Sequence, residues 1–224
     1  QCTISTHEAT AANQVWCWDI TWLPGPARGV YFYLYLILDI YSRKVVGWEI
    51  HEEESSENAS RLVSKTHLRE GVGDRPLILH SDNGSPMKGA SLLTTLYKLN
   101  VASSYSRPRV SNDNAYAESI FRTCKYRPDY PYKGFADLTA ARQWVLQFVH
   151  WYNHTHKHSG IKFISPAQRH AGMGAEIMRQ RKTVYAAARA KNPERWSGNI
   201  RNWELPGVVY LNPENEQAVL TETG

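Results

Sequence analysis

Three acidic residues stand at positions where a carboxylate needs an explanation. Asp19 lies inside the aromatic run "QVWCWDITWL", and burying a carboxylate there costs roughly several kcal/mol unless it is paired or binds a cation. Asp82 follows the apolar run "PLIL", where a strand is expected to end, and 35 residues separate it from Glu118 in "NDNAYAESIFRTCKY". Taken singly, each has a simpler explanation: a salt bridge for Asp19, a turn for Asp82 and a solvated helix surface for Glu118.

The elements around these residues predict a sheet that brings them together. Apolar periodicity and turn residues indicate the order βββ-α-β-α-β. The expected strands cover residues 14–23, 30–40, 43–50, 77–80 and 101–105, and the expected helices cover 55–70 and 89–100. Short links predict an antiparallel meander first, and helical links predict parallel strands afterwards. In such a sheet Asp19 and Asp82 lie side by side, and a following helix carries Glu118 to them.

The second half of the chain is expected to be mainly helical. Asn112 and Asp113 are expected to cap the helix of Glu118, which should end near Arg127 because Pro128 stops it. Longer helices are predicted at 135–153 and 166–192, and one strand-like stretch at 207–212. The predicted organisation is an N-terminal lead-in (1–13), a catalytic core (14–155) and a C-terminal extension (156–224).

Three carboxylates at one point repel each other, so without a cation at least one pKa should rise. Hard divalent cations bound through oxygen remove this repulsion, and we expect two ions of Mg²⁺ or Mn²⁺ about 3.5–4 Å apart. One ion would act on the attacking oxygen of a phosphodiester reaction and the other on the leaving oxygen.

In order and spacing, "WDIT", "HSDNGS" and "DNAYAESIFRTCKY" resemble the catalytic core of DDE transposases from bacterial insertion sequences, which are relatives of retroviral integrases. "LDIYSRKVVGW" resembles that family's second and third strands, and "WYNHTHKHSGIKFISPAQ" the stretch after its long helix. The resemblance runs from about Gln14 to Ala167. It implies an α/β, ribonuclease-H-like fold: a mixed five-stranded sheet with flanking helices, here followed by a helical and irregular extension. It also implies that Asp19, Asp82 and Glu118 are the catalytic metal ligands, with Asp19 bridging the ions.

The function implied is metal-dependent DNA cleavage and strand transfer in transposition, by at least a dimer because two DNA ends must be brought together. Two alternatives remain open: a DNA-binding remnant without the chemistry, and a metal-dependent nuclease that does not join strands. The family usually carries an N-terminal helix-turn-helix region, and nothing before Asp19 can hold one. We therefore expect binding mainly through phosphates, with weak sequence preference.

Charge indicates where DNA would bind. Residues 1–100 carry 9 basic and 11 acidic residues, whereas residues 101–224 carry 17 and 10. The basic second half suits a polyanion. In related integrases a Lys at the position of Lys125 lies at the bound DNA end. The residues expected to contact DNA are Arg107, Arg109, Asn114, Arg122, Lys125 and His156.

Other candidate groups have simpler interpretations. Asp39 is expected to face solvent or to pair with Arg43. The alternating histidines of residues 154–158 suggest DNA-facing polar residues more than a zinc site. His80 either supports Asp82 or is simply packed. The three cysteines have no metal-ligand spacing, so they are expected to be bystander thiols. No apolar run is long enough to cross a bilayer, and we expect a cytoplasmic, nucleoid-associated bacterial protein.

Overall fold

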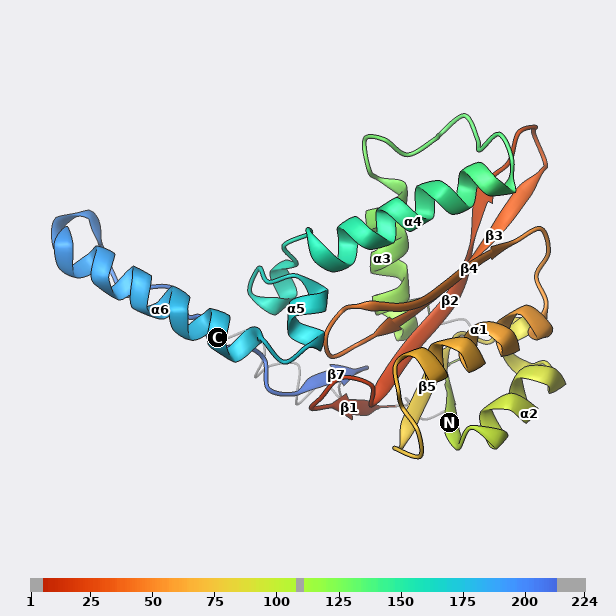
Figure 1. Cartoon of the computed structure of the whole chain (residues 1–224), viewed down its shortest axis with the longest axis horizontal. Helices are drawn as coiled ribbons and strands as arrows, with labels where there is room; N and C mark the ends of the chain where they lie inside the picture. Colours follow the sequence, from red (N-terminus) through yellow and green to blue (C-terminus); the bar gives the residue numbers. More distant parts are fainter. Residues whose placement is uncertain (1–5, 108–110, 213–224) are drawn as a thin grey trace.

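The computed structural model describes residues 6–107 and 111–212, and a five-stranded sheet lies at its centre (Figure 1). The strands are β2 (Val15–Pro24), β3 (Tyr31–Asp39), β4 (Val45–His51), β5 (Leu77–Ser81) and β6 (Val101–Tyr105). Their order is β4-β3-β2-β5-β6. β2, β3 and β4 are antiparallel, and β5 runs parallel to both β2 and β6. The predicted meander followed by parallel strands is confirmed.

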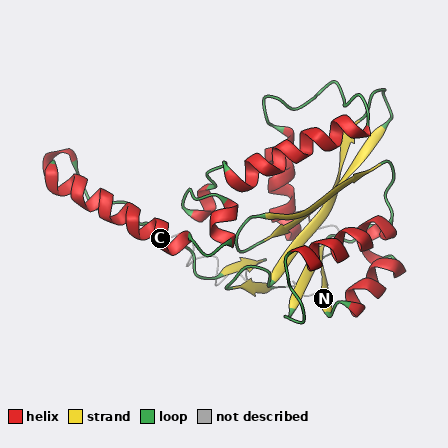
Figure 2. Ribbon diagram, in the orientation of Figure 1, coloured by secondary structure: helices red, strands yellow, loops and turns green. Residues whose placement is uncertain are grey.

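Helices cover both faces of this sheet (Figure 2). They are α1 (Ser56–Arg69) and α2 (Ala90–Lys98) on one face, and α3 (Ala115–Lys125) and α4 (Leu138–His154) on the other. Alternation along β2 divides its side chains between two cores. Trp16 and Trp18 pack with α1 and α2, whereas Val15 and Cys17 pack with α3 and α4. Successive side chains of β2 therefore point to opposite faces of the sheet.

Polar caps set where the flanking helices begin. The side chain of Ser55 accepts a hydrogen bond from the backbone N–H of Asn58 at the start of α1, as its Ser-rich start predicted. Asp137 does the same for α4 through the backbone N–H of Ala140. The long helix expected at 135–153 therefore begins at Leu138, and Phe135 is buried just before it.

The C-terminal extension departs from its prediction in two ways. The single helix expected at 166–192 is two helices, α5 (Pro166–His170) and α6 (Gly174–Lys191), because the chain turns at Gly172 with a left-handed φ of +74°. α6 projects away from the sheet (Figure 1). Beyond it, β7 (Val209–Leu211) pairs antiparallel with β1 (His7–Ala9), a partner that the sequence did not predict. None of the helices in the described ranges has the length and apolarity that a membrane span needs.

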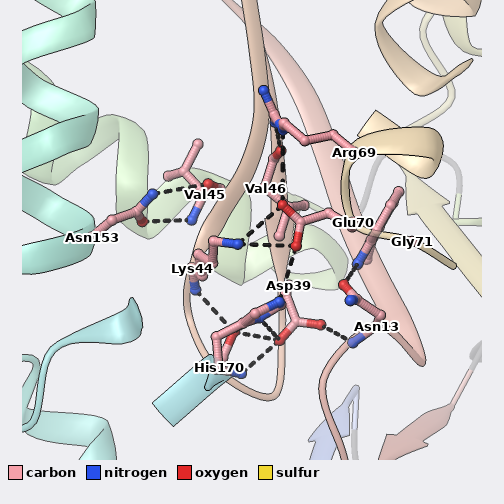
Figure 3. Close-up of polar contacts among 12 residues, drawn as sticks. Asn13, Asp39, Lys44, Val45, Val46, Arg69, Glu70, Gly71, Asn153 and His170 are labelled. Atoms are coloured by element: carbon pink, nitrogen blue, oxygen red, sulfur yellow. Dashed lines mark hydrogen bonds and ion pairs between the residues drawn. The ribbon is translucent and has the colours of Figure 1, made fainter. Parts of the chain in front are cut away.

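Asp39, at the end of β3, is fully buried, so the expectation that it faces solvent or pairs with Arg43 is wrong (Figure 3). Its carboxylate accepts hydrogen bonds from the backbone N–H groups of Ser42 and Asn13, both at 2.7 Å, and from the Ser42 hydroxyl at 2.6 Å. The Arg43 guanidinium instead lies 3.9 Å from the centre of the Tyr116 ring. Groups of the turn after β3, together with Asn13, therefore supply the hydrogen bonds that the buried Asp39 carboxylate needs.

The same polar cluster attaches α5 to the core (Figure 3). His170, the last residue of α5, lies with Nδ1 2.9 Å from the Ser42 hydroxyl and Nε2 3.0 Å from the Glu70 carboxylate. Lys44 Nζ lies 2.9 Å from the same carboxylate. Burial opposes ionisation of Glu70, but hydrogen bonds from His170 and Lys44 lower its pKa to about 2. Burial likewise opposes the charge on His170, but neighbouring carboxylates raise its pKa.

Candidate active site

β2 and β5 bring Asp19 and Asp82 to one end of the sheet. In their parallel register Cys17 lies beside His80, and continuing that register by two residues sets Asp19 beside Asp82. Asp19 has the same position in the alternation as Cys17, which packs with α3. The Asp19 side chain therefore points to the face of the sheet that α3 covers.

The turn after β5 fixes the Asp82 carboxylate. Asp82 Oδ1 accepts a hydrogen bond from the backbone N–H of Gly84 at 2.9 Å, so the simple turn interpretation of "SDNG" is correct. The Asn83 side chain donates to the carbonyl of Ser106, which ties this turn to the chain after β6. The turn and a role in chemistry are compatible, because the turn holds the carboxylate at the strand end.

α3 delivers Glu118 to the same region. Asn114 is buried at the start of this helix, and its Nδ2 donates to the carbonyl of Trp18 at 3.2 Å. Trp18 directly precedes Asp19, so this bond joins the start of α3 to β2 next to the first carboxylate. Glu118 lies in the first turn of α3 and is exposed. Three separate elements thus contribute the three carboxylates.

Asp113 does not cap α3 as predicted, because Arg107 competes for its carboxylate. Arg107 donates to it from its backbone N–H at 2.8 Å and from its guanidinium at 3.0 Å. This pairing lowers the pKa of Asp113. The Asp113 carbonyl lies 3.0 Å from His80 Nε2, and the opposite ring nitrogen of His80 lies 2.9 Å from the Ser104 hydroxyl. His80 is therefore a buried residue that links β5, β6 and the segment before α3.

Electrostatics indicate that the three carboxylates share one environment. Burial, followed by the negative charge of Asp82 and more weakly that of Glu118, raises the pKa of Asp19 to about 7. The backbone N–H of Ile20, 2.7 Å from Asp19 Oδ1, opposes this rise. Within residues 6–107 and 111–212, no three His, Cys, Asp or Glu side chains lie close enough to hold a metal ion as they stand. The charges of Asp82 and Glu118 therefore act on Asp19, but the three carboxylates do not close around a common point.

Two basic residues, Arg122 and Lys125, lie in the last turn of α3. Burial lowers the pKa of Lys125, and the charges of Cys124 and, more weakly, Asp19 oppose the shift. Arg122 is exposed, with its guanidinium 5.7 Å from the centre of the Tyr126 ring.

The remaining residues expected to bind DNA are placed differently. Arg107 is paired with Asp113, and Asn114 is buried against β2. His156 is half-buried, with its ring stacked on Tyr152 at 5.4 Å between centroids. Arg109 lies outside the described residues. Their contacts with DNA stay predictions, and the burial of Asn114 favours a role in holding α3.

Two polar side chains beside the site were not singled out from the sequence. Asn83 joins the turn of Asp82 to Ser106, and Ser104 joins His80 to β6. The sequence could have indicated the role of Asn83, since an Asn side chain in a turn often forms a hydrogen bond with the backbone. The sequence could not have indicated the role of Ser104, because a Ser in a short strand is common whether or not it has a buried hydrogen-bond partner.

Comparisons with known proteins cover most of this region. Two family models described as integrase core domain match residues 9–111 and 99–166. The transposase for insertion sequence element IS904 of Lactococcus lactis is 33% identical over 163 residues, which are 71% of this chain and 62% of that protein. The transposase InsF for insertion sequence IS3A of Escherichia coli is 28% identical over 71% of this chain and 54% of its own length. The chain thus spans less than two thirds of these relatives.

Solved structures confirm the expected ribonuclease-H-like fold. A chain of the simian T-cell lymphotropic virus intasome complexed with a PP2A regulatory subunit superposes with a TM-score of 0.59 at 17% identity, covering 72% of this chain and 55% of that one. The HTLV-2 integrase catalytic core domain in complex with magnesium gives 0.51 at 16% identity, covering 71% and 97%. At such identities the likeness concerns the fold.

Proposed function

Because this chain belongs to the integrase core family, we propose that it is the catalytic part of an insertion-sequence transposase that cleaves DNA and transfers the cut ends. One observation carries this proposal: β2, the end of β5 and the first turn of α3 direct Asp19, Asp82 and Glu118 to one side of the sheet. The curated relatives, transposases of bacterial insertion sequences, support the same reaction.

We propose that these three carboxylates would hold two Mg²⁺ or Mn²⁺ ions. The donor set is all oxygen, which suits hard divalent cations. Asp19 is also the member that needs a cation most, since burial and two like charges oppose its ionisation. The ions, when bound, supply the charge that activates the attacking oxygen and stabilises the leaving oxygen of the phosphodiester. The HTLV-2 core, solved with magnesium, is a precedent for that cation in this fold.

The chain's own residues would orient the reaction. The Gly84 turn holds Asp82, and the bond from Asn114 to Trp18 holds the start of α3. Glu118, exposed in the first helical turn, would rotate toward the other two carboxylates when their charge is neutralised. Lys125, in the last turn of the same helix, would contact a phosphate of the DNA end. Water as nucleophile gives nicking and a 3′-hydroxyl gives joining, so no Ser, Cys or His nucleophile is needed.

Strand transfer also requires an assembly, because two DNA ends must be held together. We propose that the acting form is at least a dimer bound to DNA. The viral neighbours are an intasome and a core domain described as a trimeric form, so assemblies of this fold are precedented. The basic balance of residues 101–224 suits the DNA partner.

The substitution Asp82→Asn tests this function. It removes a ligand charge with little change in volume, so nicking of supercoiled plasmid and joining of a pre-cut DNA end in Mg²⁺ should fall at least about a hundredfold. Binding of labelled DNA, measured by fluorescence anisotropy in Ca²⁺, should stay close to wild type. Asp74→Asn, the same change at an exposed loop position, is the matched control and should leave all three measurements unchanged.

The same assays separate the alternatives. Nicking without joining of pre-cut ends identifies a nuclease, and DNA binding without either reaction identifies an inactive remnant. Retention of most activity by Asp82→Asn in Mg²⁺ would show that the carboxylate assignment is wrong.

A further inference from the structure

β7 returns from the C-terminal extension to the core beside the start of α3. It pairs with β1, with His7 opposite Leu211. Val209 and Leu211 are buried, 6% and 1% exposed, in the same hydrophobic core as Ala117 and Ile120 of α3. The strand therefore packs against the helix that carries Glu118.

Two hydrogen bonds join the end of this strand to the residues just before Glu118. The Tyr116 hydroxyl donates to the carbonyl of Tyr210 at 2.7 Å. The Asn212 side chain donates from Nδ2 to the carbonyl of Asp113 at 2.9 Å. At a rise of about 1.5 Å per residue, Tyr116 lies only about 3 Å along the helix from Glu118. Both bonds therefore act on the turn of chain that sets the position of Glu118.

The backbone of Asn212 is itself held in place. It adopts a left-handed φ of 51°, and its carbonyl accepts a hydrogen bond from the Thr6 hydroxyl at 3.0 Å. The same Asp113 carbonyl also lies 3.0 Å from His80 Nε2. His80 of β5 and Asn212, the residue after β7, thus both contact one carbonyl, immediately before the N-cap of α3.

From these contacts we propose that β7 positions Glu118 for metal binding, with Tyr116 and Asn212 as the positioning residues. This inference rests on the proposed function, since it assigns a role within that site. A metal ligand must be held to within about 0.5 Å, and a ligand in the first turn of a helix depends on whatever fixes that turn. The C-terminal extension would therefore contribute to the geometry of the active site by positioning Glu118.

Asn212→Gly is the direct test. Glycine accepts the left-handed backbone and removes the side chain, including the amide that donates to the Asp113 carbonyl. Asn100→Gly is the matched control, because Asn100 has a similar φ of 54° in the turn before β6. We expect the Mn²⁺ concentration for half-saturation, measured by calorimetry, to rise about fivefold in Asn212→Gly, which corresponds to the loss of one net hydrogen bond. The control should bind Mn²⁺ like wild type.

Tyr116→Phe is an independent second variant, since it keeps the ring under Arg43 and removes only the hydroxyl. Tyr97→Phe, at an 88% exposed position, is its control. In both test variants the first hydrogen-bonded amides of α3, from Ser119 onward, should exchange with solvent about fivefold faster. Amides of β2 and β3 should keep wild-type rates, which separates positioning from general loss of stability.

The outcomes are distinct. Weaker Mn²⁺ binding and faster exchange confined to α3 support the inference. Unchanged Mn²⁺ binding in both variants overturns it, and so does a fall in thermal stability with the metal affinity intact, because β7 would then be only structural. Wild-type protein that binds Mn²⁺ but neither nicks nor joins DNA would refute the proposed function instead, and the calorimetric comparison would still decide the role of β7.

Discussion

The contact between Glu70 and the pair formed by Lys44 and His170 should make the attachment of α5 depend on pH. Replacing Glu70 by Gln keeps the shape and one oxygen acceptor but removes the charge that holds both cations. The Glu70 side chain is only 8% exposed, so little solvent screening weakens this interaction. We therefore expect Glu70→Gln to destabilise the folded protein and to do so most strongly in a defined pH range.

The expected loss of folding stability follows from the shift in the pKa of the Glu70 carboxyl group. Lowering the pKa of Glu70 from 4.5 to about 2 corresponds to about 3 kcal/mol in favour of the folded state. Because Gln retains part of the hydrogen bonding, we expect a loss of about 2 kcal/mol, or a Tm lower by about 4–8 °C. The Glu70 contribution is complete above pH 4.5 and disappears as the pH falls toward 2. The His170 contribution, from a raised pKa, is complete below pH 6.5 and disappears at higher pH.

The loss should therefore be largest between about pH 4.5 and 6.5. Urea unfolding of wild type and Glu70→Gln at several pH values from 3 to 8 measures it. Glu57→Gln is the control, because Glu57 bonds Ser91 on a fully exposed surface. A difference between wild type and Glu70→Gln that stays constant across this range would refute the electrostatic explanation.

Three further predictions concern the candidate site and its core. Ca²⁺ should not support nicking or joining, since its looser coordination disfavours a close pair of ions, and robust cleavage in Ca²⁺ alone would contradict the proposed mechanism. Lys125→Ala should weaken binding about uniformly across DNA sequences and reduce the slope of log affinity against log salt by about 1; an unaltered slope in a salt titration would place Lys125 away from DNA. Cys17 and Cys124 should resist iodoacetamide in native protein and react after unfolding, because both thiols are buried and burial raises the pKa of each, that of Cys124 to about 12; rapid native labelling would disprove this.

Local patterns predicted the main elements because the physics behind them is local. Aromatic and β-branched runs gave β2, β3 and β4, and apolar spacing gave α4 to within a few residues. The sequence could also place Asp19 in a strand and Glu118 in a helix, because each lies within such a pattern. Their approach to each other depends on the register of β2 with β5 and on the bond from Asn114 to Trp18, and no local pattern contains either contact.

Three of the errors concern tertiary contacts, which local sequence patterns do not contain. Asp39 is predicted to face solvent or to pair with Arg43, but its carboxylate accepts hydrogen bonds from a turn and from Asn13, 26 residues earlier. Asp113 is predicted to cap a helix, but its carboxylate pairs with the Arg107 side chain, six residues earlier. β1 was missed because a three-residue strand has no periodicity, and its partner β7 lies near the other end of the described chain.

The pairing of β1 with β7 also has a consequence for the order of folding. His7 and Leu211 are 204 positions apart, and three residue pairs cannot offset the entropy of closing so long a loop in an unfolded chain. We expect the five-stranded sheet to form first and the β1–β7 pair to join last, after the core has brought its ends together. During synthesis this pairing must wait until residues 209–211 have left the ribosome. A nascent chain would thus hold the start of α3 without the hydrogen bonds to Tyr210 and Asn212 until translation has passed β7.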